Sequence, residues 1–246
     1  MKLAVINFSG NVGKSTVARH LLAPRIRGAQ LIAVESLNAD DGRATRIRGR
    51  QFAELQDFLQ TTSNVIVDIG ASNVEELLAQ MRRYDGSHTD FDGFVLPTVP
   101  PRKQQQDTAA TLAELSRIGV PAGRIRLVFN QIDDDRPIEK VFETLLAYCK
   151  ASGDAQPRME AIMRINEVYA RVRGTDQTLT ELASDVTDYK AEIAKASSTF
   201  ERTMLAQKLA TQRLARGVIR ELDSCYTALD LGSLGHEPGN LTVRAA

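Results

Sequence analysis

The chain has 246 residues, and its 31 lysines and arginines balance 31 aspartates and glutamates. This balance excludes bulk charge as a basis for binding nucleic acid or an anionic membrane, so any such contact needs a local patch. With 43% hydrophobic and 25% charged residues, the composition is typical of a soluble globular protein. No apolar run approaches the roughly 20 residues that cross a bilayer, and no signal peptide is recognisable, so we expect a cytoplasmic protein without a transmembrane segment.

Short apolar runs alternate with helical patterns through the first two thirds of the chain. The apolar runs predict strands at residues 3–8, 30–34, 65–68, 91–96 and 125–130, with a further short strand near 159–163. The helical patterns lie near residues 14–22, 50–59, 74–84, 106–118 and 137–150. This alternation predicts an α/β fold with a doubly wound, mostly parallel sheet that binds ligands at the carboxyl ends of its strands.

Beyond residue 150 the pattern becomes mainly helical. Apolar residues over 179–200 recur in steps of three and four, which predicts an amphipathic helix or a short coiled-coil seam. The pattern continues to residue 229 in a shifted phase, which predicts a turn or stutter near 200–205. The region either packs on the sheet and on itself or forms an intermolecular coiled coil. We therefore expect an α/β domain over 1–173, a helical region over 174–231 and a flexible tail over 232–246.

The segment between the first predicted strand and the first predicted helix carries the clearest chemistry. It reads Ser9, Gly10, Asn11, Val12, Gly13, Lys14, Ser15 and Thr16. Its two glycines let the backbone fold tightly, so that N–H groups and the start of the following helix can surround an anion. Lys14 can reach the β- and γ-phosphates of a nucleotide, and the Ser15 hydroxyl can bind the Mg²⁺ that bridges them. The segment therefore predicts a phosphate-binding loop, and with it a P-loop nucleotide-binding domain over 1–173.

A second metal ligand is predicted at Asp68. This residue ends an apolar strand whose residues are buried on both faces, so its carboxylate would face the same crevice as the loop. An aspartate at a strand end is also a common turn former. After a phosphate loop in an alternating α/β pattern, however, the metal role is favoured, and we assign Ser15 and Asp68 as ligands of Mg²⁺.

Residues 9–16 resemble the deviant phosphate loop of the ParA/MinD family of partitioning ATPases, whose pattern is Lys-Gly-Gly-Val-Gly-Lys-Thr-Thr. The resemblance implies an α/β ATPase that dimerises around ATP and uses hydrolysis as a timer for assembly on DNA or a membrane. Two positions depart from the pattern, because Ser9 replaces the signature lysine and Asn11 replaces a glycine. The signature lysine reaches across the dimer to the partner's nucleotide, so Ser9 bears directly on how hydrolysis is activated.

The resemblance extends over about residues 1–173. The stretch 31–38 looks like the second strand and its acidic switch, with Glu35 in the first acidic place and Asp40 or Asp41 available to supply another carboxylate. Residues 128–130 are similar to a Val-x-Asn string whose asparagine reads the adenine edge, which implies that role for Asn130. The strings 7–14, 68–78 and 104–108 look like those of StbB-type plasmid stability proteins. That likeness implies action in plasmid maintenance or conjugative transfer beside a small DNA-binding plasmid protein.

Three functions stay open on this reasoning. The first is a nucleotide-dependent homodimer that hydrolyses ATP, in which Lys14 neutralises phosphate charge and Glu35 or Asp40 helps to position the attacking water. The second is a nucleotide-binding scaffold with little or no hydrolysis, and the third is a small-molecule kinase. GTP also stays open, because residues 130–133 come close to a guanine-reading string. A cluster of basic residues suits a solvated loop, a phosphate clamp or direct DNA contact; its members are Arg43, Arg46, Arg48 and Arg50.

Overall fold

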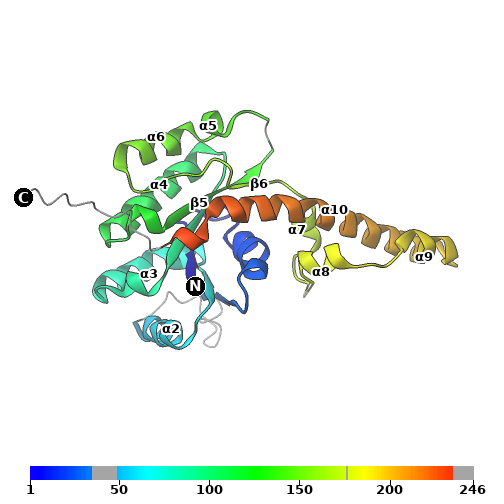
Figure 1. Ribbon diagram of the computed structural model, residues 1–246, viewed down its shortest axis with the longest axis horizontal. Helices are drawn as coiled ribbons and strands as arrows, with labels where there is room; N and C mark the ends of the chain where they lie inside the picture. The colour runs from blue at the N-terminus through cyan, green and yellow to red at the C-terminus, as the bar shows by residue number, and fades with distance from the viewer. Residues whose placement is uncertain (35–48, 134, 176, 235–246) are drawn as a thin grey trace, which may run out of the picture.

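The centre of the protein is a six-stranded parallel sheet (Figure 1). The computed structural model describes residues 1–34, 49–133, 135–175 and 177–234. The strands are β1 (Lys2–Val5), β2 (Gln30–Ala33), β3 (Val65–Asp68), β4 (Gly93–Thr98), β5 (Ile125–Ile132) and β6 (Ile162–Arg164), in the order β2-β3-β1-β4-β5-β6. From β1 the chain crosses to the edge strand β2, returns to β3 between β2 and β1, and then builds outward through β4, β5 and β6 on the other side of β1. This order confirms the predicted doubly wound α/β class and places the ligand-binding crevice beside β1.

Helices cover both faces of the sheet, since neighbouring residues of a strand point to opposite faces. In β1, Ala4 belongs to one apolar core, whereas Leu3 and Val5 belong to the other. The first core is closed by α2 (Gly49–Thr61), α3 (Ala71–Arg83), α4 (Arg102–Arg117) and α6 (Glu143–Ser152). The second is closed by α1 (Lys14–Thr16) with its π-helical continuation η1 (Val17–Leu22), by α7 (Val168–Arg171), and by residues of α8 (Leu179–Ser184) and α10 (Thr199–Leu229). Short 3-10 turns lie at Ala23–Arg25, Ser87–Asp90, Ala122–Arg124 and Leu231–Ser233.

Two central strands end at different places from those predicted. β1 stops at Val5 rather than at residue 8, because the Asn7 side chain accepts a hydrogen bond from the Ser9 N–H and turns the chain. β4 runs over Gly93–Thr98 rather than 91–96 and includes Pro97. A proline cannot donate to a neighbouring strand, but the Pro97 carbonyl is used, since it accepts a hydrogen bond from Asn7 Nδ2 at 2.9 Å.

The predicted helix over 137–150 is divided in two. α5 (Ile138–Val141) and α6 are separated at Phe142, whose φ and ψ of −110° and 26° leave the helical region. The Gln105 side chain of α4 enters this break, where its Nε2 donates to Val141 O at 2.9 Å and its Oε1 accepts from Leu145 N at 3.2 Å. Phe142 itself is fully buried against Phe129. A contact from another element therefore interrupts a pattern that is locally helical.

The prediction of one helix over 179–200 is wrong. α8 ends at Ser184 and α9 (Tyr189–Lys195) follows, because two aspartates bind local groups in place of continuing the helix. Asp185 accepts hydrogen bonds from Thr187 N and the Tyr189 hydroxyl, and Asp188 accepts from the first N–H groups of α9. α10 begins at Thr199, so the break falls a few residues before the predicted 200–205.

α8, α9 and the part of α10 that packs on them form an arm that projects from the α/β body (Figure 1). The other end of α10 lies in the body, where Val218, Leu222 and Leu229 share a core with β1. Arg126 of β5 holds this end, since its guanidinium donates to the Leu229 carbonyl at 2.7 Å and to the Ser233 hydroxyl at 2.8 Å. The division of the chain at residue 173 stays a prediction. No helix within the described ranges is long and apolar enough to span a membrane.

Candidate functional site

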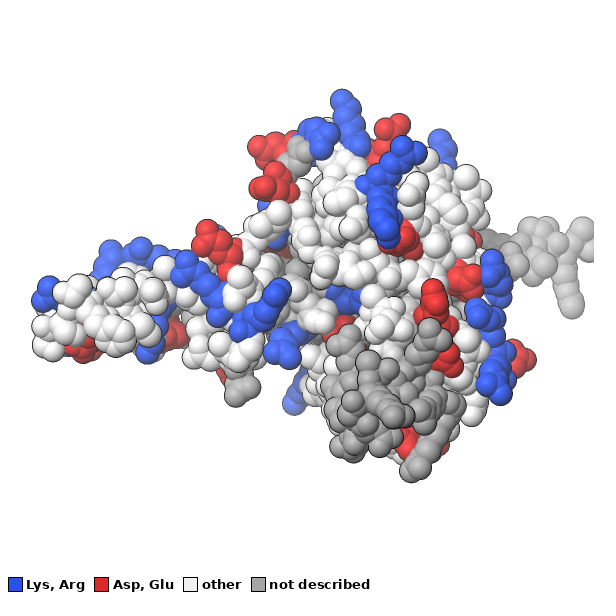
Figure 2. Space-filling view, turned by 180° about the vertical axis from the view of Figure 1, so that it is seen from behind, with Lys and Arg blue, Asp and Glu red and all other residues white. Residues whose placement is uncertain are grey.

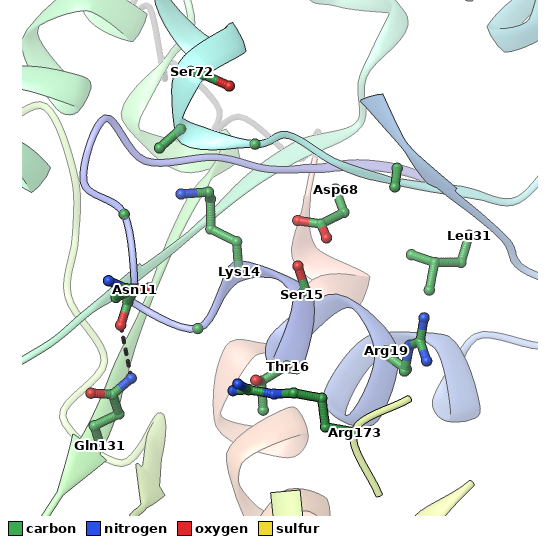
Figure 3. Close-up of a pocket in the computed structure, with 15 residues that line it drawn as sticks. Asn11, Lys14, Ser15, Thr16, Arg19, Leu31, Asp68, Ser72, Gln131 and Arg173 are labelled. Carbon is green, nitrogen blue, oxygen red and sulfur yellow. Dashed lines mark hydrogen bonds between the residues drawn. The ribbon is translucent and has the colours of Figure 1, made fainter. Parts of the chain in front are cut away.

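A cavity of about 850 Å³ lies at the carboxyl ends of the strands around β1 (Figure 3). The loop after β1 and the helix that follows it form one wall, and residues of β2, β3 and β5, the start of α3 and the turn after α7 contribute the others. The lining residues are Gly10, Asn11, Gly13, Lys14, Ser15, Thr16, Arg19, Leu31, Ala33, Asp68, Gly70, Ala71, Ser72, Gln131 and Arg173. The cavity therefore occupies the crevice that the strand order and the loop together predict.

The start of the loop is tied to the sheet by Asn7. This side chain is fully buried and makes three hydrogen bonds within 2.9 Å, to Ser9 N, Pro97 O and the Thr108 hydroxyl. Because an amide can donate and accept at once, one residue connects the loop with β4 and α4. Asn7 was not among the predicted site residues, although an amide near the end of a buried apolar strand was a usable signal.

The middle of the loop rests on β5. Gly13 has a φ of +88°, which favours glycine, and a Cβ there would overlap Nδ2 of Asn130. That Nδ2 donates to Val12 O at 2.8 Å, and Asn130 is only 3% exposed. Asn130 thus supports the loop through this hydrogen bond and is not among the residues that line the cavity. Its reading of adenine stays a prediction.

Lys14 places a positive charge inside the loop. Its side chain is 8% exposed, and Nζ donates to Ser9 O at 2.7 Å and to Asn7 O at 3.2 Å. The ammonium is therefore positioned by backbone carbonyls of the same loop. The loop presents this charge together with the first backbone N–H groups of α1, which is an arrangement suited to an anion.

Ser15 and Asp68 face each other across the cavity (Figure 3). The register between β1 and β3 pairs Val5 with Asp68, which places the carboxylate beside the strand that leads into the loop. A hydroxyl and a carboxylate are hard oxygen ligands of the kind that Mg²⁺ prefers. Within the described residues no group of three or more His, Cys, Asp and Glu side chains could hold a metal. Mg²⁺ usually keeps several waters and binds one or two carboxylates together with substrate phosphates. The pair fits that mode of binding.

Several lining residues were not predicted from the sequence, among them Gln131, Arg19 and Arg173. Gln131 has a φ of +57°, and its Nε2 donates to Asn11 O at 2.9 Å, which joins the end of β5 to the loop. Arg19 lies four residues after Ser15, and helical spacing could have indicated that both face the cavity. Arg173 comes from the turn after α7, and no local signal indicates its position.

Other predicted residues lie elsewhere. Ser9 and Val12 are buried at 6% and 0% exposure and do not line the cavity. The acidic candidates Glu35, Asp40 and Asp41 lie outside the described residues, as do three of the clustered arginines, Arg43, Arg46 and Arg48. The fourth, Arg50, lies in the first turn of α2.

Comparisons with known proteins give a likeness to solved structures but no match in sequence. No protein-family model matches the chain, and no curated protein matches it. Among solved structures, the chain is similar to the ATP complex of a single-residue variant of McdA from Cyanothece, with 12% sequence identity and a TM-score of 0.45. The alignment covers 91% of this chain and 96% of that one.

Proposed function

We propose that the protein binds ATP with Mg²⁺ in the cavity beside the loop of residues 9–16. The observation that carries this proposal is the joint placement of Lys14, Ser15 and Asp68 around one cavity at the carboxyl ends of a parallel sheet. A triphosphate is bound by backbone N–H groups, a lysine and a metal held by a hydroxyl and a carboxylate, and this cavity offers the N–H groups, the lysine and the two oxygen ligands. The structural support given to the loop by Asn7 and Asn130 favours a preformed site.

Each residue has a distinct part in the proposed complex. The loop N–H groups and Lys14 neutralise phosphate charge, and Ser15 with Asp68 orients the metal. Mg²⁺, when bound, would draw negative charge from the β- and γ-phosphate oxygens. Glu35 or Asp40 remains our candidate for positioning the attacking water.

We further propose that the protein acts as a nucleotide-dependent homodimer in plasmid maintenance or conjugative transfer, beside a small DNA-binding plasmid protein. This part depends on the resemblance of residues 7–14, 68–78 and 104–108 to the StbB-type proteins within the ParA/MinD family. Direct DNA contact would need locally gathered arginines, because basic and acidic side chains are interspersed on the face that Figure 2 shows.

A second candidate function is a nucleotide-binding scaffold that hydrolyses ATP slowly or not at all. It is favoured by Ser9, which is 6% exposed and uses its carbonyl oxygen to hold Lys14 of the same chain. A short, buried side chain cannot extend to a partner's nucleotide as a lysine at this position would. Rapid phosphate release by the purified protein would exclude this candidate.

The first experiment measures ATP·Mg²⁺ binding by wild type, Lys14→Ala and a control, Lys150→Ala. Lys150 is exposed in α6 and does not line the cavity. We expect at least a tenfold loss of affinity for Lys14→Ala and no change for the control, because charge-assisted phosphate contacts are strong. If wild type binds no nucleotide, or if Lys14→Ala binds as well as wild type, the proposal is refuted.

Two further measurements separate the candidates. Phosphate release without an added acceptor, with and without DNA, supports the ATPase switch, whereas binding without turnover supports the scaffold. Size-exclusion chromatography with light scattering then tests the dimer. A mass that stays monomeric with ATP at all protein concentrations would contradict it.

A further inference from the structure

Arg173 connects the cavity with the helical arm. Among the residues that line the cavity, it is the one that follows β5 in the chain. It lies in the turn between α7 and α8, and the residues that flank this turn, Val172 and Leu179, are 4% and 2% exposed in the same core as η1. The turn is therefore held at both ends while the exposed Arg173 side chain extends into the cavity beside Thr16 (Figure 3).

The charges of the cavity favour an anion at this end. Its described lining contains the cations Lys14, Arg19 and Arg173 and one carboxylate, Asp68. Arg173 makes no ion pair with a described carboxylate, whereas Arg171, two residues earlier, pairs with Glu167 at 3.2 Å. A guanidinium placed in this way can donate two parallel hydrogen bonds to a phosphate.

The order of groups along the cavity indicates which phosphate is involved. Lys14, Ser15 and Asp68 serve the β- and γ-phosphates and the metal in the proposed complex. In Figure 3, Arg173 lies on the opposite side of Ser15 and Thr16 from Asp68. It therefore faces the end that the α-phosphate and sugar would occupy.

We propose that Arg173 binds the α-phosphate of the nucleotide in the cavity of the same chain. Through this contact, nucleotide binding would be coupled to the position of the helical arm. This inference rests on the proposed nucleotide binding. The coupling follows from the chain path, because Arg173 is a few residues before Thr178, whose side chain and Glu181 form the capping box that starts α8. α8 in turn packs along α10, so a shift of the turn moves the base of the arm.

A contact to the α-phosphate is made equally by ADP and ATP. Arg173 would therefore report whether the cavity is occupied, and contacts nearer Asp68 would report the γ-phosphate. This separates its role from that of Lys14, whose loss should weaken ATP binding more than ADP binding.

The test uses the full chain and measures the affinities of ADP·Mg²⁺ and ATP·Mg²⁺ for wild type, Arg173→Ala, Arg173→Lys and Arg171→Ala. The last variant removes a nearby exposed arginine that does not line the cavity. We expect Arg173→Ala to lower the affinities for ADP·Mg²⁺ and ATP·Mg²⁺ by similar factors of about 5 to 20. Arg173→Lys should recover part of this loss, and Arg171→Ala should change either affinity by less than about twofold.

Hydrogen exchange of α8 amides, with and without saturating ADP, tests the coupling. Nucleotide should slow exchange in α8 of wild type but not of Arg173→Ala, and circular dichroism should show both folded. Three results would each overturn the inference while leaving the proposed function intact. The first is an Arg173→Ala variant that binds both nucleotides with wild-type affinity, and the second is an Arg171→Ala variant that loses as much affinity as Arg173→Ala. The third is slowed exchange in α8 when Arg173→Ala is saturated with ADP. Absence of nucleotide binding by wild type would instead refute the proposed function and this inference with it.

Discussion

Gly13→Ala should destabilise the protein through two separate effects at the same position. The residue has a φ of +88°, and an alanine in the left-handed region costs about 1 to 2 kcal/mol. The new Cβ would also overlap Nδ2 of Asn130 and lie 3.4 Å from its Cγ. Asn130 is 3% exposed, so its amide can move only by giving up the 2.8 Å hydrogen bond to Val12 O.

The expected magnitude follows from these terms. Leaving a buried polar group unsatisfied costs about 1 to 3 kcal/mol. Replacing glycine also restricts the unfolded chain, and this offsets about 0.4 to 1 kcal/mol of the loss in stability. The net loss in the free energy of unfolding should be about 2 to 4 kcal/mol, which is a large share of the stability of a typical domain.

Urea denaturation followed by circular dichroism measures this loss, and the loop supplies a matched control. A Cβ added at Gly10 would meet no atom within 4 Å, and Gly10 is not in the left-handed region, so Gly10→Ala should change stability by less than about 1 kcal/mol. In the double variant Gly13→Ala/Asn130→Ala, the overlap is gone and only the backbone cost of Gly13→Ala should remain relative to Asn130→Ala. A loss below about 1 kcal/mol for Gly13→Ala, or an equal loss for Gly10→Ala, would refute the reasoning.

Two other predictions concern buried charged or titratable groups. Arg126→Met should lower the free energy of unfolding by about 2 to 4 kcal/mol and speed hydrogen exchange at the end of α10. The reason is that Arg126 is 5% exposed and the substitution removes its donors to Leu229 O and Ser233 Oγ. Unchanged hydrogen exchange at the end of α10 would contradict the anchoring role of Arg126. His20 is 8% exposed, and burial together with Arg19 lowers its pKa from 6.5 to about 4. The unfolded state therefore binds more protons between pH 6.5 and 4, so stability falls as pH is lowered through this window, by about 2 kcal/mol at pH 5. His20→Gln should remove that part of the pH dependence in urea titrations between pH 7 and 5, and an unchanged pH dependence would contradict the assignment.

Much of the fold was predictable because its signals are local. Alternating apolar runs and helical patterns indicate strands and helices through residues only a few positions apart, and β3 matches its predicted range at Val65–Asp68. The same holds for the loop at residues 9–16, since its glycines, Lys14 and Ser15 are adjacent in the chain. The doubly wound arrangement then follows from the order of elements.

The errors share a different origin. The helix predicted over 137–150 is interrupted by Gln105 of α4, and the helix predicted over 179–200 is interrupted where Asp185 and Asp188 bind backbone and side-chain groups of their own turn. In both cases hydrogen bonds outside the helical pattern satisfy the backbone as well as a continued helix would. Periodicity of apolar residues cannot register such competition, because it counts burial and not hydrogen-bond partners.

The sequence by itself determined the class of the fold and the chemical character of the phosphate-binding loop, because both depend on residues adjacent in the chain. Only the tertiary structure decided that Asn130 is hydrogen-bonded to the loop, that Asp68 faces Ser15, and that Arg173 lines the same cavity. Those positions are set by strand register and by packing of the two apolar cores, which bring together segments that are far apart in the chain.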